Sequence, residues 1–294
     1  MARRIKHRFV RAQRLYMLLA IWFVFSSAAI ARAAKAFPDS TDVYNMSFSE
    51  LSKLRITSAS KVSQRITEVP ATVAVITAAE IRDRGYFTLE DALSDLPGFQ
   101  FRGIPGFNTY FFQRGFPNQN NLTLVLIDGV QINELNSGGA YGGGQYSLSN
   151  VERIEVVYGP ASVAYGTNAV SGIINIVTKS PRSNSFELSA TAGSFNSVKT
   201  DFVCSYVNEK KTFSLQASGM IKKSSKSDLA GAAGDNNWTD LIDNFEDDYS
   251  FDLKMEAFDI TFGSNYQYKQ TSTAVWNKSV GTVFRDYGTS WNIQ

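Results

Sequence analysis

The chain has 294 residues, a length that fits one large domain or two ordinary ones. Its net charge of +2 comes from the N-terminus, because the first 33 residues hold seven Lys and Arg and no acid, which leaves −5 for the rest. A basic surface for nucleic acid is therefore not predicted. The only histidine, His7, lies in the basic segment, and the only cysteine is Cys204. An internal disulfide, a cysteine zinc cluster and histidine-based catalysis are excluded for the rest of the chain. We expect no enzymatic activity, no metal and no cofactor.

Residues 1–33 have the pattern of a secretory signal peptide. A basic region ends at Arg14, an apolar core follows, and small residues such as Ala31 and Ala33 stand at a spacing that permits cleavage. A membrane-anchoring helix is the alternative, but the apolar run is short for a span. We therefore predict an exported protein.

The middle of the chain, residues 69–181, carries the signals of a compact α/β unit. Thr72–Ile76 is predicted as a strand, and a helix start follows at Thr77, where Glu80 completes a capping-box pattern. Thr88 and Asp91 repeat this pattern more loosely before a second helix, which Pro97-Gly98 ends. The stretch "NLTLVLIDGV" (121–130) reads as a buried strand with an Asp-Gly turn.

Two further strand-like runs, Val151–Tyr158 and Ser171–Val177, enclose a segment rich in Gly, Ala and Ser. Neither Gly166 nor Gly172 is followed by the Lys and Ser or Thr of a nucleotide-binding loop. We interpret the small residues as turns that pack closely, where a Cβ atom would clash.

After Pro181 the pattern changes to runs of about ten residues with alternating polarity and no helix between them. Five or six such runs are visible in residues 182–294. Alternation with aromatics near the strand ends is typical of a transmembrane β-barrel, although a soluble antiparallel sheet alternates in the same way. The joins alternate too: Asn208–Lys211 and Ala257–Asp259 are short, while about 223–249 and 271–282 are long. Five or six strands are fewer than the roughly eight of the smallest membrane barrel, so we expect an N-terminal part of a longer barrel.

Together these features resemble the TonB-dependent outer-membrane receptors. The resemblance rests on "VPATVAVITAAEI" (69–81), "LEDALSDLPGF" (89–99), "QRGF" (113–116), "LVLIDGV" (124–130) and the stretch 151–179. It implies a fold in which an α+β plug domain, with a small mixed sheet and short helices, precedes the first five or six antiparallel strands of a transmembrane β-barrel. It also implies a location in the outer membrane of a Gram-negative bacterium, in contact with its lipid.

The resemblance further implies that residues 34–68 lie in the periplasm and carry the segment that binds TonB. The candidate is "LRITSAS", because its alternation would let it add as a strand to a partner's sheet. A plain linker is the alternative. The predicted TonB-binding residues are Leu54, Arg55, Ile56, Thr57, Ser58, Ala59 and Ser60.

The same resemblance implies that ligand would contact two outward-facing loops of the plug. Aromatic and Arg side chains there suit a bulky, often anionic chelate, and the alternative is that they pack the plug against the wall. The candidates are Arg102, Phe107 and Tyr110 in the first loop, and Tyr141 and Tyr146 in the second.

Three charged residues in the family motifs, Arg114, Arg153 and Glu155, are predicted to form ion pairs between the plug and the barrel. The stretch "SGGAYGGG" (137–144) lacks dinucleotide-binding spacing, and we predict a flexible loop at the plug apex. The acidic stretch 235–248 lacks the Gly of an EF-hand, so we predict a solvated loop there.

The implied function is energy-coupled uptake of a scarce solute, with a ferric siderophore or another iron chelate first and cobalamin second. The alternative is a truncated plug module that binds TonB or ligand in the periplasm without transport. Exposed strand edges argue against that alternative, because such edges aggregate.

Overall fold

The computed structural model describes residues 55–56, 64–65, 71–103, 109–117, 122–134, 138–140, 143–160, 165, 169–225, 245–258, 260–277 and 282–293. All of them lie in one compact unit, Thr41–Gln294. The predicted signal peptide lies outside the described residues. Among the described residues, no helix has the length and apolar character needed to cross a bilayer.

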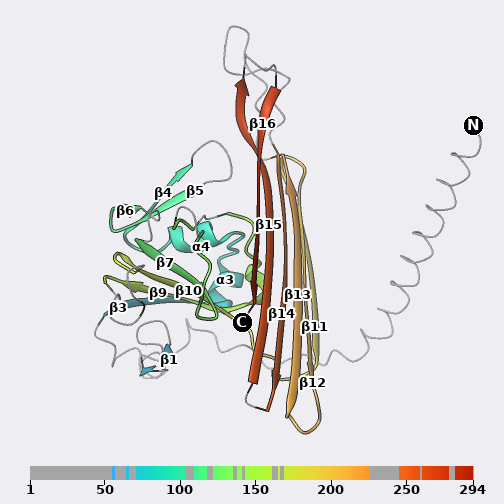
Figure 1. Ribbon diagram of the computed structural model, residues 1–294. Helices are drawn as coiled ribbons and strands as arrows, with labels where there is room; N and C mark the ends of the chain where they lie inside the picture. The colour runs from blue at the N-terminus through green and yellow to red at the C-terminus, as the bar shows by residue number, and fades with distance from the viewer. Residues whose placement is uncertain are drawn as a thin grey trace, which may run out of the picture. The chain divides into compact units, whose positions relative to one another are not determined.

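The first part is an α/β unit built on a five-stranded mixed sheet (Figure 1). Its β7 and β10 are parallel and its other neighbouring strands are antiparallel. This confirms the predicted small mixed sheet with short helices. In spatial order the strands are β3 (Thr72–Thr77), β9 (Val151–Tyr158), β10 (Gly172–Thr178), β7 (Thr123–Ile127) and β8 (Val130–Gln131).

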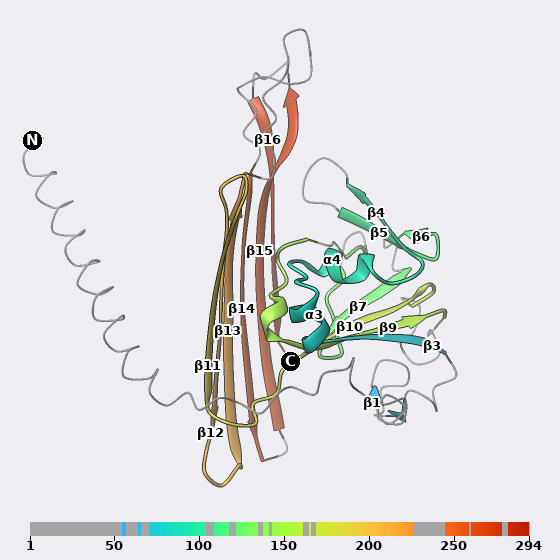
Figure 2. The ribbon, with the colours of Figure 1, turned by 180° about the vertical axis from the view of Figure 1, so that it is seen from behind.

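Two short helices, α3 (Ala78–Asp83) and α4 (Leu89–Ser94), begin where the sequence predicts them. Both have complete capping boxes, in which the N-cap threonine and the acid three residues later satisfy each other's backbone N–H groups. In α4, Leu89, Ala92 and Leu93 are almost fully buried. The helices therefore contribute one apolar face each to the core of the sheet. Figure 2 shows α3 and α4 beside the strands of the α/β unit.

The sheet is buried on both faces, as expected for strands of continuous apolar sequence. One cluster contains Ile76, Leu93 and Ile174, and a smaller one on the other face contains Leu124 and Ile173. A three-stranded sheet of β4 (Phe99–Gly103), β5 (Thr109–Gln113) and β6 (Phe116–Pro117) joins the larger cluster through Phe99 and Phe111. A 3₁₀ helix, η4 (Leu148–Asn150), precedes β9.

The second part is a meander of six antiparallel strands, each paired with its sequence neighbours. This confirms the predicted opening strands of a barrel, which is unclosed here. Figure 1 shows the strands running side by side. They are β11 (Ser185–Gly193), β12 (Ser197–Val207), β13 (Phe213–Ser224), β14 (Glu246–Ala257), β15 (Ile260–Asn277) and β16 (Thr282–Ile293).

The distribution of apolar and polar side chains over the two faces of the meander is the reverse of that in a soluble sheet. Its apolar side chains are exposed, with Leu188 at 65% and Ile260 at 72%. Its polar side chains on the opposite face are buried, among them Lys199, Asp201 and Gln216. An apolar exposed face and a polar enclosed face are what a membrane barrel wall requires, so the structure favours the barrel reading over the soluble one.

Two predicted joins differ from the structure. The long join expected at 271–282 is shorter, because β15 continues to Asn277 and β16 begins at Thr282. The additional part of β15 contains Thr, Val and Trp residues, and these residue types favour strands even where apolar and polar residues do not alternate. Of the acidic stretch predicted to be a solvated loop, Glu246–Asp248 belongs to β14, and Asp248 is buried.

Gly172 shows why small residues surround β10. Its φ is +155°, and an added Cβ would lie 2.1 Å from the carbonyl oxygen of Val157 and 2.6 Å from the Gln113 amide nitrogen. Gln113 is fully buried and donates to the same Val157 carbonyl at 3.0 Å. Gly172 therefore lets the β5 side chain reach the sheet, as the sequence predicts for this segment.

We expect Gly172→Ala to destabilise the α/β unit by about 3 kcal/mol or more, because backbone atoms cannot move away from the new methyl group. Gly159→Ala is the control, since its φ is also positive, at +102°, but no atom lies within 4 Å of the added Cβ. The stability of each variant is measured by urea unfolding, with protease sensitivity of the α/β unit as the readout. Equal losses in the two variants would contradict the packing argument.

Candidate functional site: the interface between the α/β unit and the meander

The Asp-Gly turn after β7 forms one polar link between the two parts. Asp128 has a positive φ of 49°, and its carboxylate accepts hydrogen bonds from the backbone N–H and the hydroxyl of Thr178, at 2.8 and 2.5 Å. The backbone N–H of Gly129 donates to Asn175 Oδ1 at 3.2 Å. The turn is thus tied to the end of β10, where the chain leaves the sheet.

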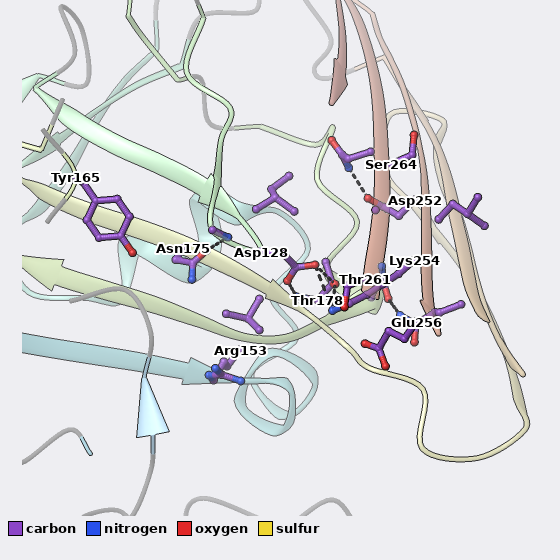
Figure 3. A pocket seen from close by; sticks show the side chains of 18 residues that line it. Asp128, Arg153, Tyr165, Asn175, Thr178, Asp252, Lys254, Glu256, Thr261 and Ser264 are labelled. Atoms are coloured by element: carbon purple, nitrogen blue, oxygen red, sulfur yellow. Dashed lines mark hydrogen bonds and ion pairs between the residues drawn. The ribbon is translucent and has the colours of Figure 1, made fainter. Parts of the chain in front are cut away.

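Lys254 of β14 completes this link from the meander. Its Nζ lies 3.5 Å from both Asp128 Oδ2 and Thr178 Oγ1 (Figure 3). The same Nζ lies 3.3 Å from Ser180 Oγ. The Lys254 and Asp128 side chains are 16% and 18% exposed, so the pair is partly shielded from water. A shielded pair with further hydrogen bonds is costly to break, because one charge would remain without its partner.

Further hydrogen bonds join the two parts beside η4. Ser147 Oγ donates to Asp201 Oδ1 of β12 at 3.1 Å, and Gln216 Nε2 of β13 donates to Asn150 Oδ1. All four of these residues are buried. The polar face of the meander is therefore satisfied in part by the α/β unit.

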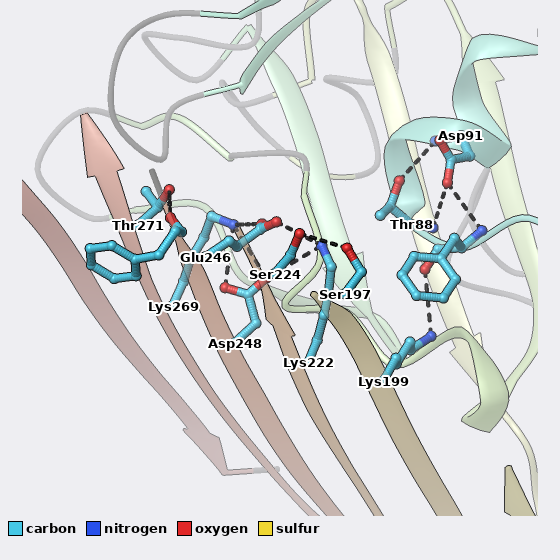
Figure 4. Close-up of polar contacts among 12 residues, drawn as sticks. Thr88, Asp91, Ser197, Lys199, Lys222, Ser224, Glu246, Asp248, Lys269 and Thr271 are labelled. Atoms are coloured by element: carbon cyan, nitrogen blue, oxygen red, sulfur yellow. Dashed lines mark hydrogen bonds and ion pairs between the residues drawn. The ribbon is translucent and has the colours of Figure 1, made fainter. Parts of the chain in front are cut away.

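A four-charge network occupies the polar face of β13, β14 and β15. Lys222 Nζ lies 2.8 Å from Glu246, and Lys269 Nζ contacts Glu246 and lies 3.3 Å from Asp248 (Figure 4). All four side chains are at most 13% exposed. Two lysines and two acids balance one another, so the network needs no counter-charge from the α/β unit.

Glycine backbone and one aromatic ring of the α/β unit lie against this network. A Cβ at Gly144 would lie 2.2 Å from Lys222 Nζ and 2.6 Å from Asp248 Oδ2. The Phe87 ring faces Lys199 Nζ at 4.9 Å and Lys222 Nζ at 5.9 Å. The predicted flexible loop 137–144 is therefore closely packed at Gly143 and Gly144, which is the physical reason for glycine there.

The pKa of Glu90 in α4 is raised, first by burial and then by the carboxylates of Asp91 and Glu246. Lys269 and Lys222 act in the opposite direction. Charged side chains of the meander therefore influence the pKa of Glu90, although α4 belongs to the α/β unit.

A cavity of about 700 Å³ lies between the α/β unit and strands β14 and β15 (Figure 3). Its volume is in the range of small-molecule sites. Polar and charged side chains dominate the labelled lining, which includes Asp128, Arg153, Tyr165, Asn175, Thr178, Asp252, Lys254, Glu256, Thr261 and Ser264.

The predicted TonB-binding segment is described only at Arg55 and Ile56, which form β1 (Arg55–Ile56). It pairs antiparallel with β2 (Gln64–Arg65), with Arg55 opposite Arg65. Leu54 and residues 57–60 lie outside the described residues.

The predicted ligand residues are only partly covered by the structure. Phe107 and Tyr141 lie outside the described residues. Arg102 and Tyr110 are paired across β4 and β5 in the backbone register, and their side chains are not described. Tyr146 is 6% exposed and belongs to the larger apolar cluster. Its burial favours the packing alternative over direct ligand contact.

The three residues predicted to pair the plug with the barrel have their described contacts within the α/β unit. Arg153 lies 2.7 Å from Glu155 on the same strand, and Glu155 is fully buried. The guanidinium of Arg114 lies 5.0 Å from the centre of the Tyr158 ring. Arg153 also lines the cavity toward β14 and β15, so its predicted role toward the barrel stays a prediction.

Sequence reasoning did not assign the residues that carry the interface. Asp128 was seen only as a turn residue, and Lys254, Lys199 and Asp201 only as polar positions of an alternating pattern. The available signal was that each of these three charges stands on the polar side of its strand, where a barrel encloses it.

Comparison with known proteins agrees with the geometry. Residues 65–173 match the family described as the TonB-dependent Receptor Plug Domain. The vitamin B12 transporter BtuB of Vibrio vulnificus (strain CMCP6) is 28% identical over 216 residues, which are 73% of this chain and 30% of that protein. The iron-regulated outer membrane virulence protein of Vibrio cholerae serotype O1 is 35% identical over 130 residues, covering 42% and 20%.

Solved structures share the fold. The ferripyoverdine receptor of the outer membrane of Pseudomonas aeruginosa aligns with a TM-score of 0.56 and 18% identity, over 74% of this chain and 28% of that one. The siderophore receptor PiuA of Acinetobacter baumannii aligns with a TM-score of 0.52 and 23% identity, over 71% and 28%.

The fold and the interface define a class: a plug domain seated against the opening strands of a β-barrel wall. The α/β unit is thus a plug domain of the TonB-dependent receptor type, and the chain as a whole resembles the TonB-dependent outer-membrane receptors. It spans 30% or less of the length of the two curated relatives given above.

We expect Lys254→Met to speed amide hydrogen exchange around the Asp128 turn by about 5- to 150-fold, which corresponds to about 1–3 kcal/mol of lost stability. The reason is that Asp128 would keep its charge without its cation. Lys223→Met is the matched control, because Lys223 pairs with Asp247 at 3.9 Å and is 68% exposed, and such pairs contribute little. Unchanged exchange in Lys254→Met would show that the ion pair does not hold the turn.

A second prediction concerns acid stability. Hydrogen bonds from Tyr86, at 2.5 Å, and Arg84, at 2.9 Å, lower the pKa of Asp95. Its stabilising effect is therefore complete above the ordinary aspartate pKa of about 3.9 and is lost as the pH falls through the lowered value. Asp95→Asn should flatten the loss of plug stability below about pH 4. Asp83→Asn, a change to an exposed acid of α3, is the control, and a similar acid profile in wild type and Asp95→Asn would refute the assignment.

Proposed function

We propose that the chain acts in TonB-dependent, energy-coupled uptake of a scarce solute across the outer membrane, and not as an enzyme. The observation that carries this proposal is a plug domain on a wall whose apolar face is exposed and whose polar face is enclosed. Exposed Leu188 and Ile260 suit lipid. This polarity argues against the alternative of a soluble plug module in the periplasm.

The proposed substrate is a ferric siderophore or another iron chelate, with cobalamin second. The support is that the similar proteins include siderophore receptors and a vitamin B12 transporter. Of the five plug residues predicted for ligand contact, only Tyr146 has a described side chain, so the choice between these substrates rests on the relatives.

The proposed partner is TonB, at residues 54–60. The pairing of β1 with β2 supports this, because it shows that Arg55 and Ile56 can form a strand. A pair of two-residue strands is only marginally stable. Such a strand can exchange its partner for another sheet edge.

The test is uptake of radiolabelled ferric siderophores and cobalamin by cells that have this protein in the outer membrane. We expect uptake of one class that depends on TonB, and a drop of about tenfold or more in Ile56→Pro with ligand binding retained, because Pro removes a backbone donor from the added strand. Gln64→Pro is the control, since it disturbs β2 but leaves residues 54–60 intact. Uptake that is independent of TonB, or equal in Ile56→Pro, would sink the coupling proposal.

A further inference from the structure

A second and much smaller cavity lies between the plug and strands β14 and β15. Its volume is about 20 Å³, which is enough for one water-sized occupant. Oxygen-bearing side chains from both parts line it: Ser147, Asn150 and Thr178 from the plug, and Ser250, Asp252, Asn265 and Gln267 from the wall.

The wall side of this cavity is a rectangle of four residues on two neighbouring strands. Ser250 stands opposite Gln267, and Asp252 stands opposite Asn265. Opposite residues in an antiparallel pair have Cβ atoms about 5 Å apart, and residues two positions along a strand are about 7 Å apart on the same face. The four side chains therefore surround one point, which plug residues 147–151 cover.

Two polar atoms at this point have no partner among the described residues: Asn265 Oδ1 and Ser250 Oγ. Asn265 donates its amide to Asp252 Oδ1 (Figure 3), which fixes the amide and leaves its oxygen unused. Both residues are buried, at 4% and 5% exposure. Buried polar atoms without partners are costly and rare, so an occupant that binds oxygen is expected.

Charge favours a cation as that occupant. Asp252 accepts hydrogen bonds from Ser218 and Asn265, but no Lys or Arg in the described part of the chain forms an ion pair with it. The two cations that line the larger cavity together with Asp252 are already engaged: Lys254 with Asp128, and Arg153 with Glu155. When Asp252 is ionised, no cationic side chain that the structure describes neutralises it.

One carboxylate among neutral oxygens fits a monovalent ion. Calcium sites use six to eight oxygens with several carboxylates, and no group of three or more His, Cys, Asp or Glu that could hold a metal occurs in the described ranges. Neutral oxygens can replace the hydration shell of an alkali cation.

We propose that this cavity binds a single monovalent cation, held by Asp252, Asn265 and Ser250 and covered by the plug. The ion is enclosed only while the plug is seated, because Ser147, Asn150 and Val151 then lie over β14 and β15. The proposal depends on the seating of the plug and not on the identity of the transported solute.

The direct test is crystallography of the complete receptor, purified from outer membranes, with Rb⁺ as the only alkali cation. An anomalous peak between Asp252 and Asn265 is expected. An ordered water only, with no anomalous signal, would overturn the proposal.

A solution test uses thermal unfolding of the same receptor in KCl and in choline chloride at equal ionic strength. Potassium should raise the Tm by a few degrees through binding to the folded state, and Asp252→Asn should abolish the difference. Asp247→Asn, on the same strand, is the control and should keep it. Ser250→Ala, a milder change, should reduce the difference if Asp252→Asn does not fold. A Tm that is the same in both salts, or an undiminished difference in Asp252→Asn, would contradict the site.

Discussion

The enclosed polar face of the meander is the constraint on which the rest of the structure depends. Lys199, Asp201 and Gln216 are buried there, and buried polar groups need partners. Some partners come from the wall itself, and others come only from the plug, such as Ser147 and Asn150. The plug and the first strands of the wall therefore complete one another chemically as well as sterically.

The interface uses two kinds of contact along the strands. The network of Lys222, Glu246, Asp248 and Lys269 is balanced within the wall, so glycine backbone can lie against it without forming ion pairs. Nearer the β14–β15 join, Lys254 instead takes its partner from the plug. An ion pair thus holds the plug where its chain leaves the sheet. Against the balanced network, the plug is held by close packing of glycine backbone.

Much of the fold could be predicted from local signals. The capping boxes at Thr77 and Thr88, the Asp-Gly turn at Asp128 and the bounds of β9 all follow from patterns within a few residues. The close packing at Gly172 also followed from its small neighbours. Local signals failed where a strand ran on without apolar alternation, as in β15, and where acids of a presumed loop turned inward, as Asp248 does.

The sequence by itself determined the α/β unit and the change to a strand meander, because short-range hydrogen bonding and side-chain periodicity encode these. The receptor class followed from the resemblance of its motifs to a known family. Only the tertiary structure decided which charges meet. Asp128 and Lys254 are separated by 126 residues, and Asp252 gains its oxygen-lined cavity from residues more than 70 positions away in sequence as well as from the neighbouring strand. No periodicity records such pairs, because they depend on how two surfaces that are distant in sequence are brought together.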